Sequence, residues 1–243
     1  MKNRTHTPLI VLIVLGLLLA ACQPAAGGEE TAAPVMEEQP AETTAPPVSE
    51  PAIPPEPVTG EMATYVYETL FDAKGAPVLA FGEPTVSEDG LEYSITLRPG
   101  VVFQNGKPFN ADAVIANFNR WFDPEDALRG SGSFDAWAAA FGGFKGEVGE
   151  DGKPKSIYDG IEKVDDLNVL IHLNTPDDAF LSKLSDIAFA IISPDALAAG
   201  SMDGGTGAYV VGETTDSGVM LEPNDNYWNP SNIPDKGMEV PSE

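Results

Sequence analysis

The stretch that decides the fold runs from Glu92 to Pro124 and reads EYSITLRPGVVFQNGKPFNADAVIANFNRWFDP. Apolar and polar residues alternate from Tyr93 to Arg98, which is the period of a half-buried strand, and Pro99-Gly100 ends it. Asn105-Gly106 then predicts a tight turn. This stretch therefore predicts a strand and a turn that lead directly into the next element, a helix.

The helix is the clearest in the chain. Asn110 is a suitable N-cap, Asp112 places an acid in the first turn, and the following apolar residues recur at helical spacing. The residues of that apolar face are Val114, Ile115, Phe118 and Phe122.

The elements around this stretch are short and of both kinds. We predict helices at 63–71, at 134–141, from about Asp177, and in a short piece that ends at Ala199. We predict strands on both sides of Asp165-Asp166, and a hairpin at 208–211 and 219–222. Because strands and helices do not alternate strictly, an α/β or mixed α+β domain with a mixed sheet is favoured.

The N-terminus has the composition of a lipoprotein signal peptide, residues 1–22. Two basic residues precede an apolar run from Leu9 to Leu19, which is shorter than the roughly 20 residues of a membrane-spanning helix. LAAC, which ends at Cys22, resembles the lipobox of bacterial lipoproteins and implies lipidation of Cys22. An ordinary signal peptide or an uncleaved anchor is the alternative. Since Cys22 is the only cysteine, an internal disulfide is excluded.

Residues 23–57 differ from the rest of the chain. They contain nine prolines and seven glutamates and lack aromatic and basic residues. Such a segment buries too little apolar surface to offset its ordering entropy, so a disordered, extended tether is predicted. From Val58 to Glu243 the composition is that of a folded domain.

Charge and composition exclude several functions. The formal net charge of −25 argues against nucleic-acid binding, which needs Lys and Arg to neutralise phosphates. The chain has two histidines, His6 in the signal peptide and His172 in a predicted strand, and we find no cluster with metal-ligand spacing. A nucleophile, a base and an orienting partner cannot be assembled, so we predict no enzyme, no metal and no cofactor.

Four segments in a fixed order resemble the family 5 extracellular solute-binding proteins, the peptide, dipeptide and nickel receptors of bacterial ABC importers. They are YETLF, the stretch 92–124, IEKVDDLNVLIHLNTPDDAFLSKL with ISPDAL, and GTGAYVVGE followed by LEPNDNYW. The resemblance implies a type II periplasmic-binding-protein fold. It also implies a lipid-anchored receptor outside the cytoplasmic membrane, which captures a peptide or other small solute and delivers it to permease subunits.

The resemblance also carries expectations about single residues and about completeness. The peptide-contacting aromatic of the family falls in the segment that matches 134–141, so Phe134 and Trp137 are the candidate ligand-binding residues. Core packing is the alternative for both. Tyr227 and Trp228 are expected to pack at the lobe junction. Family members continue well beyond the NYW motif, so we expect only a partial solute-binding domain, with the second lobe missing.

Two other functions fit the same sequence. A truncated receptor fragment would not bind a solute, because a missing lobe leaves the ligand unenclosed. A surface lipoprotein could instead display residues 58–243 as an interaction domain.

Overall fold

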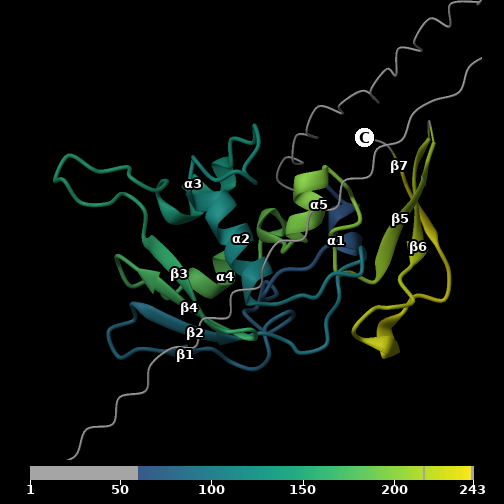
Figure 1. The fold of residues 1–243 in the computed structure, drawn as a ribbon, viewed down its shortest axis with the longest axis horizontal. Coiled ribbons are helices and arrows are strands. Elements are labelled where there is room, and N and C mark those ends of the chain that lie inside the picture. Colours follow the sequence, from purple (N-terminus) through teal and green to yellow (C-terminus); the bar gives the residue numbers. More distant parts are fainter. Residues whose placement is uncertain (1–59, 216, 242–243) are drawn as a thin grey trace, which may run out of the picture. The chain divides into compact units, whose positions relative to one another are not determined.

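The computed structural model describes residues 60–215 and 217–241, in two antiparallel sheets with helices between their strands (Figure 1). Cys22 and the predicted tether lie outside the described residues. The helices are α1 (Ala63–Val66), α2 (Ala111–Phe122), α3 (Asp135–Phe141), α4 (Phe180–Lys183) and α5 (Pro194–Ala199), with 3-10 turns η1 (Ile187–Phe189) and η2 (Pro230–Asn232). The strands are β1 (Thr85–Val86), β2 (Glu92–Thr96), β3 (Tyr158–Asp165), β4 (Asn168–Leu173), β5 (Tyr209–Thr214), β6 (Gly218–Pro223) and β7 (Met238–Pro241).

The first sheet has the order β1-β2-β4-β3, and the second has the order β5-β6-β7. Every pairing between these strands is antiparallel. The helix and strand content confirms a mixed α and β fold, whereas the mixed sheet expected from the sequence is wrong for the described strands. Tight turns join β3 to β4 and β5 to β6, and such turns can connect only antiparallel neighbours.

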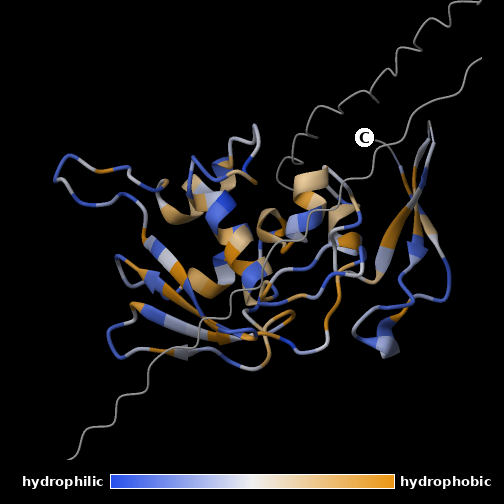
Figure 2. Cartoon of the chain, in the orientation of Figure 1, coloured by the Kyte–Doolittle hydropathy of each residue, from blue (hydrophilic) through white to orange (hydrophobic). Residues whose placement is uncertain are grey.

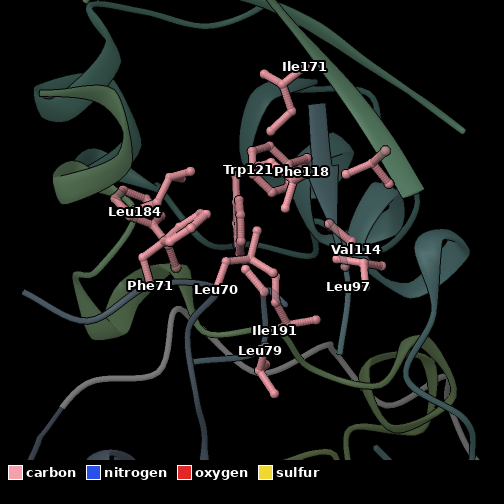
Figure 3. Packing of buried hydrophobic residues seen from close by; sticks show 14 of the residues in the cluster. Leu70, Phe71, Leu79, Leu97, Val114, Phe118, Trp121, Ile171, Leu184 and Ile191 are labelled. Atoms are coloured by element: carbon pink, nitrogen blue, oxygen red, sulfur yellow. The ribbon is translucent and has the colours of Figure 1, made fainter. Parts of the chain in front are cut away.

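Helix α2 forms as the sequence predicts. The side chain of Asn110 accepts a hydrogen bond from the backbone N–H of Ala113 at 3.0 Å, and Asp112 lies in the first turn. Val114, Phe118 and Trp121 are buried, and Figure 3 shows all three in the packed cluster between the helix and its neighbours. The cap and the buried face together explain why this segment is helical.

Replacing Asn110 by alanine is expected to lower the free energy of unfolding by about 1 kcal/mol, because it removes the acceptor for an N–H of the first helical turn. Urea unfolding followed by circular dichroism measures this loss. Asn110→Ser is the control, since serine also caps, and it should lose only a few tenths of a kcal/mol. Equal losses in the two variants would contradict a capping role.

The predicted helix over 63–71 is wrong in its second half. α1 ends at Val66, and Tyr67 has an extended backbone with φ −120° and ψ 155°. The carbonyl of Val66 accepts the N–H of Gly207 at 2.9 Å, so a distant segment takes a hydrogen bond that a longer helix would use. Likewise, the helix predicted from Asp177 is the single turn α4, which begins at Phe180.

Two hydrophobic clusters make up the core. The larger contains α2, α3 and the first sheet, and Figure 3 shows part of it. The smaller is formed by residues of α1, α5, β6 and β7, together with Tyr67, Ala190 and Ile192. Figure 2 shows hydrophobic colour interspersed with hydrophilic colour along the helices and strands that supply these clusters. In the part of the chain that the structure describes, no helix has both the length and the apolar character needed to cross a bilayer.

Two stretches of chain connect the clusters. Tyr67 belongs to the smaller cluster and Leu70 to the larger, and Ile191 and Ile192 are divided in the same way. The stretches lie side by side, since the N–H of Ile191 donates to the carbonyl of Glu68 at 3.0 Å. This crossing brings Glu68 to the boundary between the clusters.

Candidate functional site

A hollow of about 470 Å³ lies beside α3 and α4, and we call it the α3–α4 hollow. Its apolar lining comes from three alanines of α3 and from one ring of η1, namely Ala136, Ala139, Ala140 and Phe189. Because the alanines are spaced i, i+3 and i+4, they share one face of α3. Trp137 and Phe141 on the other side of this helix are fully buried. The sequence therefore gives α3 one face of bulky aromatic residues, which is buried in the core, and one face of alanines, which lines the hollow.

The polar lining of the hollow comes from the end of α4 and the chain after it, with Ser182, Lys183, Ser185 and Asp186. The ammonium of Lys183 lies 2.7 Å from Oδ2 of Asp177 and 5.9 Å from the ring centroid of Phe141. Oδ1 of Asp186 accepts the N–H of Ala188 at 3.0 Å. The hollow thus presents a cation and an anion, each held in place by a neighbour, next to an apolar wall.

The predicted ligand-binding residues lie elsewhere. Phe134 is 2% exposed and Trp137 is 0% exposed, and both belong to the larger cluster. The Trp137 ring centroid lies 4.4 Å from that of Phe141 and 5.1 Å from that of Tyr158. Here the two aromatics are core residues, which is the alternative that the sequence left open. Their contact with a ligand stays a prediction. The residues of α3 that line the hollow are the alanines, not Trp137.

Phe134 has a specific role in the loop before α3. Its φ of 53° lies in the left-handed region, which non-glycine residues seldom adopt. Two guanidinium groups lie near its ring, with centroid distances of 5.1 Å to Arg120 and 4.5 Å to Arg129. Burial lowers the pKa of Arg120 to about 10, so this guanidinium is still charged at neutral pH. Cation–π contacts of this kind stabilise the unusual backbone.

A second hollow, of about 440 Å³, lies beside β5 and is lined by Gln104, Ser201, Met202, Asp203, Val210 and Val211. The amide nitrogen of Gln104 donates to the carbonyls of Val66 at 3.1 Å and Tyr209 at 2.7 Å. These two bonds tie the Asn105-Gly106 turn to α1 and β5. Gln104 is therefore a structural link, and the hollow beside it offers only one charged side chain, Asp203.

Glu68 is the centre of the contacts between the two clusters. Its carboxylate accepts hydrogen bonds of 2.8 Å from the hydroxyls of Thr206 and Tyr227 and from Nε1 of Trp228. The guanidinium of Arg98 lies 4.2 Å from the Trp228 ring centroid. Tyr227 and Trp228 thus contact Glu68 at the boundary between the two clusters, and their packing at a lobe junction stays a prediction. Burial raises the pKa of Glu68 from its ordinary 4.5, while the three hydrogen bonds and Arg98 act in the opposite direction.

Glu68→Gln is expected to lower the free energy of unfolding at pH 7 by about 1–2 kcal/mol, because one amide oxygen must serve three donors. A pH series adds a second test. A raised pKa means that folding takes up a proton, so the contribution of Glu68 is largest below pH 4.5 and falls as the pH rises through the folded-state pKa. In urea titrations, the difference in free energy of unfolding between wild type and Glu68→Gln should therefore shrink as the pH rises. A difference that does not change with pH would contradict the raised pKa.

Sequence reasoning missed Lys183 and Asp186. The spacing of the alanines in α3 indicates a small-residue face. It does not tell which residues lie opposite that face, because α4 follows about 40 residues later in the chain. Among the described residues, no group of three or more His, Cys, Asp or Glu could hold a metal ion. Asp165 acts as a turn residue, as expected, and its side chain accepts the N–H of Leu167. Asp177 lies three residues before the start of α4, where its side chain accepts the N–H of Ala179.

Comparison with known sequences gives one consistent result. The profile of the bacterial extracellular solute-binding proteins, family 5 (middle), matches residues 74–238. The glutathione-binding protein GsiB of Salmonella typhi is 39% identical over 143 residues, which are 56% of this chain and 23% of the relative. GsiB of Pectobacterium atrosepticum is 35% identical over 178 residues, or 69% of this chain and 30% of the relative. The chain thus spans less than a third of the length of these relatives.

Solved structures agree with the sequence comparison. NikA from Brucella suis, solved with Fe(III)-EDTA, is 26% identical, with a TM-score of 0.58 over 78% of this chain and 36% of NikA. DppA from Helicobacter pylori, solved with the peptide STSA, is 26% identical, with a TM-score of 0.56 over 72% of this chain and 37% of DppA. The fold is therefore that of part of a type II periplasmic binding protein. With the family profile matched over most of the described residues, this chain belongs to the family 5 bacterial extracellular solute-binding proteins.

Proposed function

We propose that this chain is the solute-capturing component of an ABC importer, which binds a peptide or a similar small solute outside the cell and delivers it to permease subunits. The observation that carries the proposal is the family match over residues 74–238. The relatives and neighbours are named for binding glutathione, for a peptide complex and for a chelated metal complex. GsiB and DppA are binding proteins by name and NikA was solved in complex with a chelate, so the proposed role is capture of the solute without chemistry on it.

The proposal includes attachment to the outer face of the cytoplasmic membrane. Its support is the sequence alone, namely the LAAC lipobox with Cys22 and the proline-rich residues 23–57 that follow. A lipid on Cys22 and an extended tether would keep the domain near its permease while leaving it free to meet solute. The lipid is the predicted link between the protein and the membrane.

Isothermal titration calorimetry of the chain with glutathione, dipeptides and tetrapeptides tests the capture of a solute. We expect saturable binding of at least one of these compounds. Its apparent affinity should fall when a second compound that binds the same site is present. A folded chain that binds none of the compounds would favour the non-binding receptor fragment. If the chain binds another protein and none of these compounds, the interaction domain is favoured.

Lipidation is tested separately, in cells that express the whole chain. Metabolic labelling with an alkyne-tagged palmitate should label the wild type and place it in the membrane fraction. Cys22→Ser should lose both the label and the membrane association. Equal membrane association of the wild type and the variant would contradict a lipid anchor at this residue.

A further inference from the structure

We propose that Asn105 is a site of spontaneous deamidation, and that the hydroxyl group of Ser193 slows this reaction in the folded chain. Asn105 precedes Gly106, and glycine has no Cβ that would obstruct attack by its backbone nitrogen on the asparagine side chain. Asn105-Gly106 is the only Asn-Gly pair in the chain. This chemistry is independent of the capture of a solute, because it changes the chain itself.

The turn requires the glycine of this pair. Gly106 has a φ of 79°, in the left-handed region that favours glycine. Its two flanks, Val102 and Pro108, face each other in an antiparallel bridge, so the turn reverses the chain. Nothing lies within 4 Å of a Cβ built on Gly106, so the space beside this residue is open. The fold therefore retains a pair that is open to reaction.

Deamidation consumes water and releases ammonia. The backbone nitrogen of Gly106 loses its proton to hydroxide and bonds to Cγ of Asn105. The Cγ–Nδ2 bond then breaks, and Nδ2 leaves as ammonia after it takes a proton from water. Water opens the resulting cyclic imide at either of its two carbonyl carbons, which gives aspartate or isoaspartate. The chain thus gains a carboxylate at this position.

Hydrogen bonds, and not burial, restrain the reacting groups. Gly106 and Lys107 are exposed and Asn105 is half-buried, so water reaches the turn. The N–H of Gly106 donates to the carbonyl of Phe103 at 2.8 Å. Oδ1 of Asn105 accepts the N–H of Lys107 at 3.1 Å. Because the nitrogen of Gly106 must leave Phe103 before it can attack, the closed turn is the unreactive form.

Ser193 holds the leaving group of the reaction. Nδ2 of Asn105 donates to Oγ of Ser193 at 2.8 Å. Ser193 is fully buried and lies immediately before α5, so its hydroxyl is a fixed point in the structure. The side chain of Asn105 must release this hydroxyl before its Cγ can turn toward Gly106. Ser193 therefore adds a restraint that the turn alone does not supply.

Deamidation would weaken the links between the turn and the smaller cluster. Isoaspartate adds one methylene to the backbone directly after Gln104, whose side-chain amide holds the carbonyls of Val66 and Tyr209. The carboxylate of Asp195 in α5 lies 3.5 Å from the ammonium of Lys107, so a new carboxylate in the turn adds a second negative charge there. The modified chain is therefore expected to unfold at a lower urea concentration.

The test uses the full chain in mildly alkaline buffer, with proteolysis and mass spectrometry to follow aspartate and isoaspartate at position 105. We expect the folded wild type to deamidate at least ten-fold more slowly than the same chain in urea. Ser193→Ala removes the acceptor and should speed the reaction of the folded chain about five-fold, the effect of one hydrogen bond of ordinary net strength. Circular dichroism checks that each variant is folded.

Two further variants complete the test. Ser193→Cys keeps a side chain of similar size but offers only a weak sulfur acceptor, so it should also react faster than the wild type. It decides the role of Ser193 if the alanine variant does not fold. Ser156→Ala is the matched control, because Ser156 is also buried and its oxygen accepts the N–H of Tyr158 at 3.2 Å. The control should react at the wild-type rate.

Each part of the proposal has an outcome that overturns it. If neither aspartate nor isoaspartate forms at position 105 in the urea-treated chain, Asn105 is not a deamidation site. Equal rates in the folded and the urea-treated wild type overturn protection by the fold. Wild-type rates in the folded Ser193 variants, or an equal acceleration in Ser156→Ala, overturn the role of Ser193.

Discussion

Replacing Gly205 by alanine is expected to destabilise the protein by about 3 kcal/mol, the upper end of the usual cost of overpacking. A Cβ at this position would lie 2.0 Å from the carbonyl oxygen of Val66 and 2.9 Å from its carbon, distances that real Cβ atoms essentially never show. Because the crowded atoms belong to the backbone of α1, no side chain can rotate away. Relief requires the 204–207 loop to move away from α1.

That movement would also break two hydrogen bonds. The carbonyl of Gly205 accepts the N–H of Gln104 at 2.9 Å, and the carbonyl of Val66 accepts the N–H of Gly207 at 2.9 Å. Urea unfolding followed by tryptophan fluorescence measures the loss. Gly160→Ala is the matched control, since nothing lies within 4 Å of its added Cβ, and its stability should change by less than about 0.5 kcal/mol. Equal effects of the two substitutions would contradict the close approach.

Replacing Trp137 by alanine is expected to cost about 3–5 kcal/mol, the usual range for removing a large buried aromatic. Its side chain is fully buried, and its ring centroid lies within 6.2 Å of six others, those of Phe118, Trp121, Phe122, Phe141, Tyr158 and Phe189. The cavity left behind would be lined by rings from α2, α3, β3 and η1, which are held in place by one another. Urea unfolding followed by circular dichroism measures the loss.

Trp137→Phe serves as the conservative variant and also tests the role predicted from the sequence. It fills most of the space and should cost clearly less than the alanine variant. If Trp137 acts only in packing, solute affinity in Trp137→Phe should stay within two-fold of the wild type. A ten-fold loss of affinity in a folded Trp137→Phe protein would instead support ligand contact.

Elements with a strong local signal could be predicted from the sequence. Asn110 and the apolar face after it predict α2, and the alternation before Arg98 predicts β2. The predicted hairpin is confirmed as β5 and β6, and each strand is two residues longer than the prediction. In each case the neighbours along the chain supply the cap, the period or the turn, so local sequence is sufficient.

Features that depend on distant segments could not be predicted. Helical spacing continues to Phe71, yet α1 ends at Val66. The carbonyl of Val66 accepts a hydrogen bond from the N–H of Gly207, which lies 141 residues later in the chain. The contacts of Glu68 with Thr206, Tyr227 and Trp228 span a similar distance. Propensity is a weak term of under about 1 kcal/mol per residue, so such tertiary hydrogen bonds override it.

By itself, the sequence determined α2, β2 and the β5–β6 hairpin, the resemblance to the family, and the prediction of a lipid-anchored solute receptor. Only the tertiary structure decided how each face of α3 is used, with Phe134 and Trp137 in the core and the alanines lining a hollow. It also brought Lys183 and Asp186 to that hollow. The physical reason is that spacing assigns residues to faces of a helix, whereas the packing of the rings against α2 and β3 selects which face is buried.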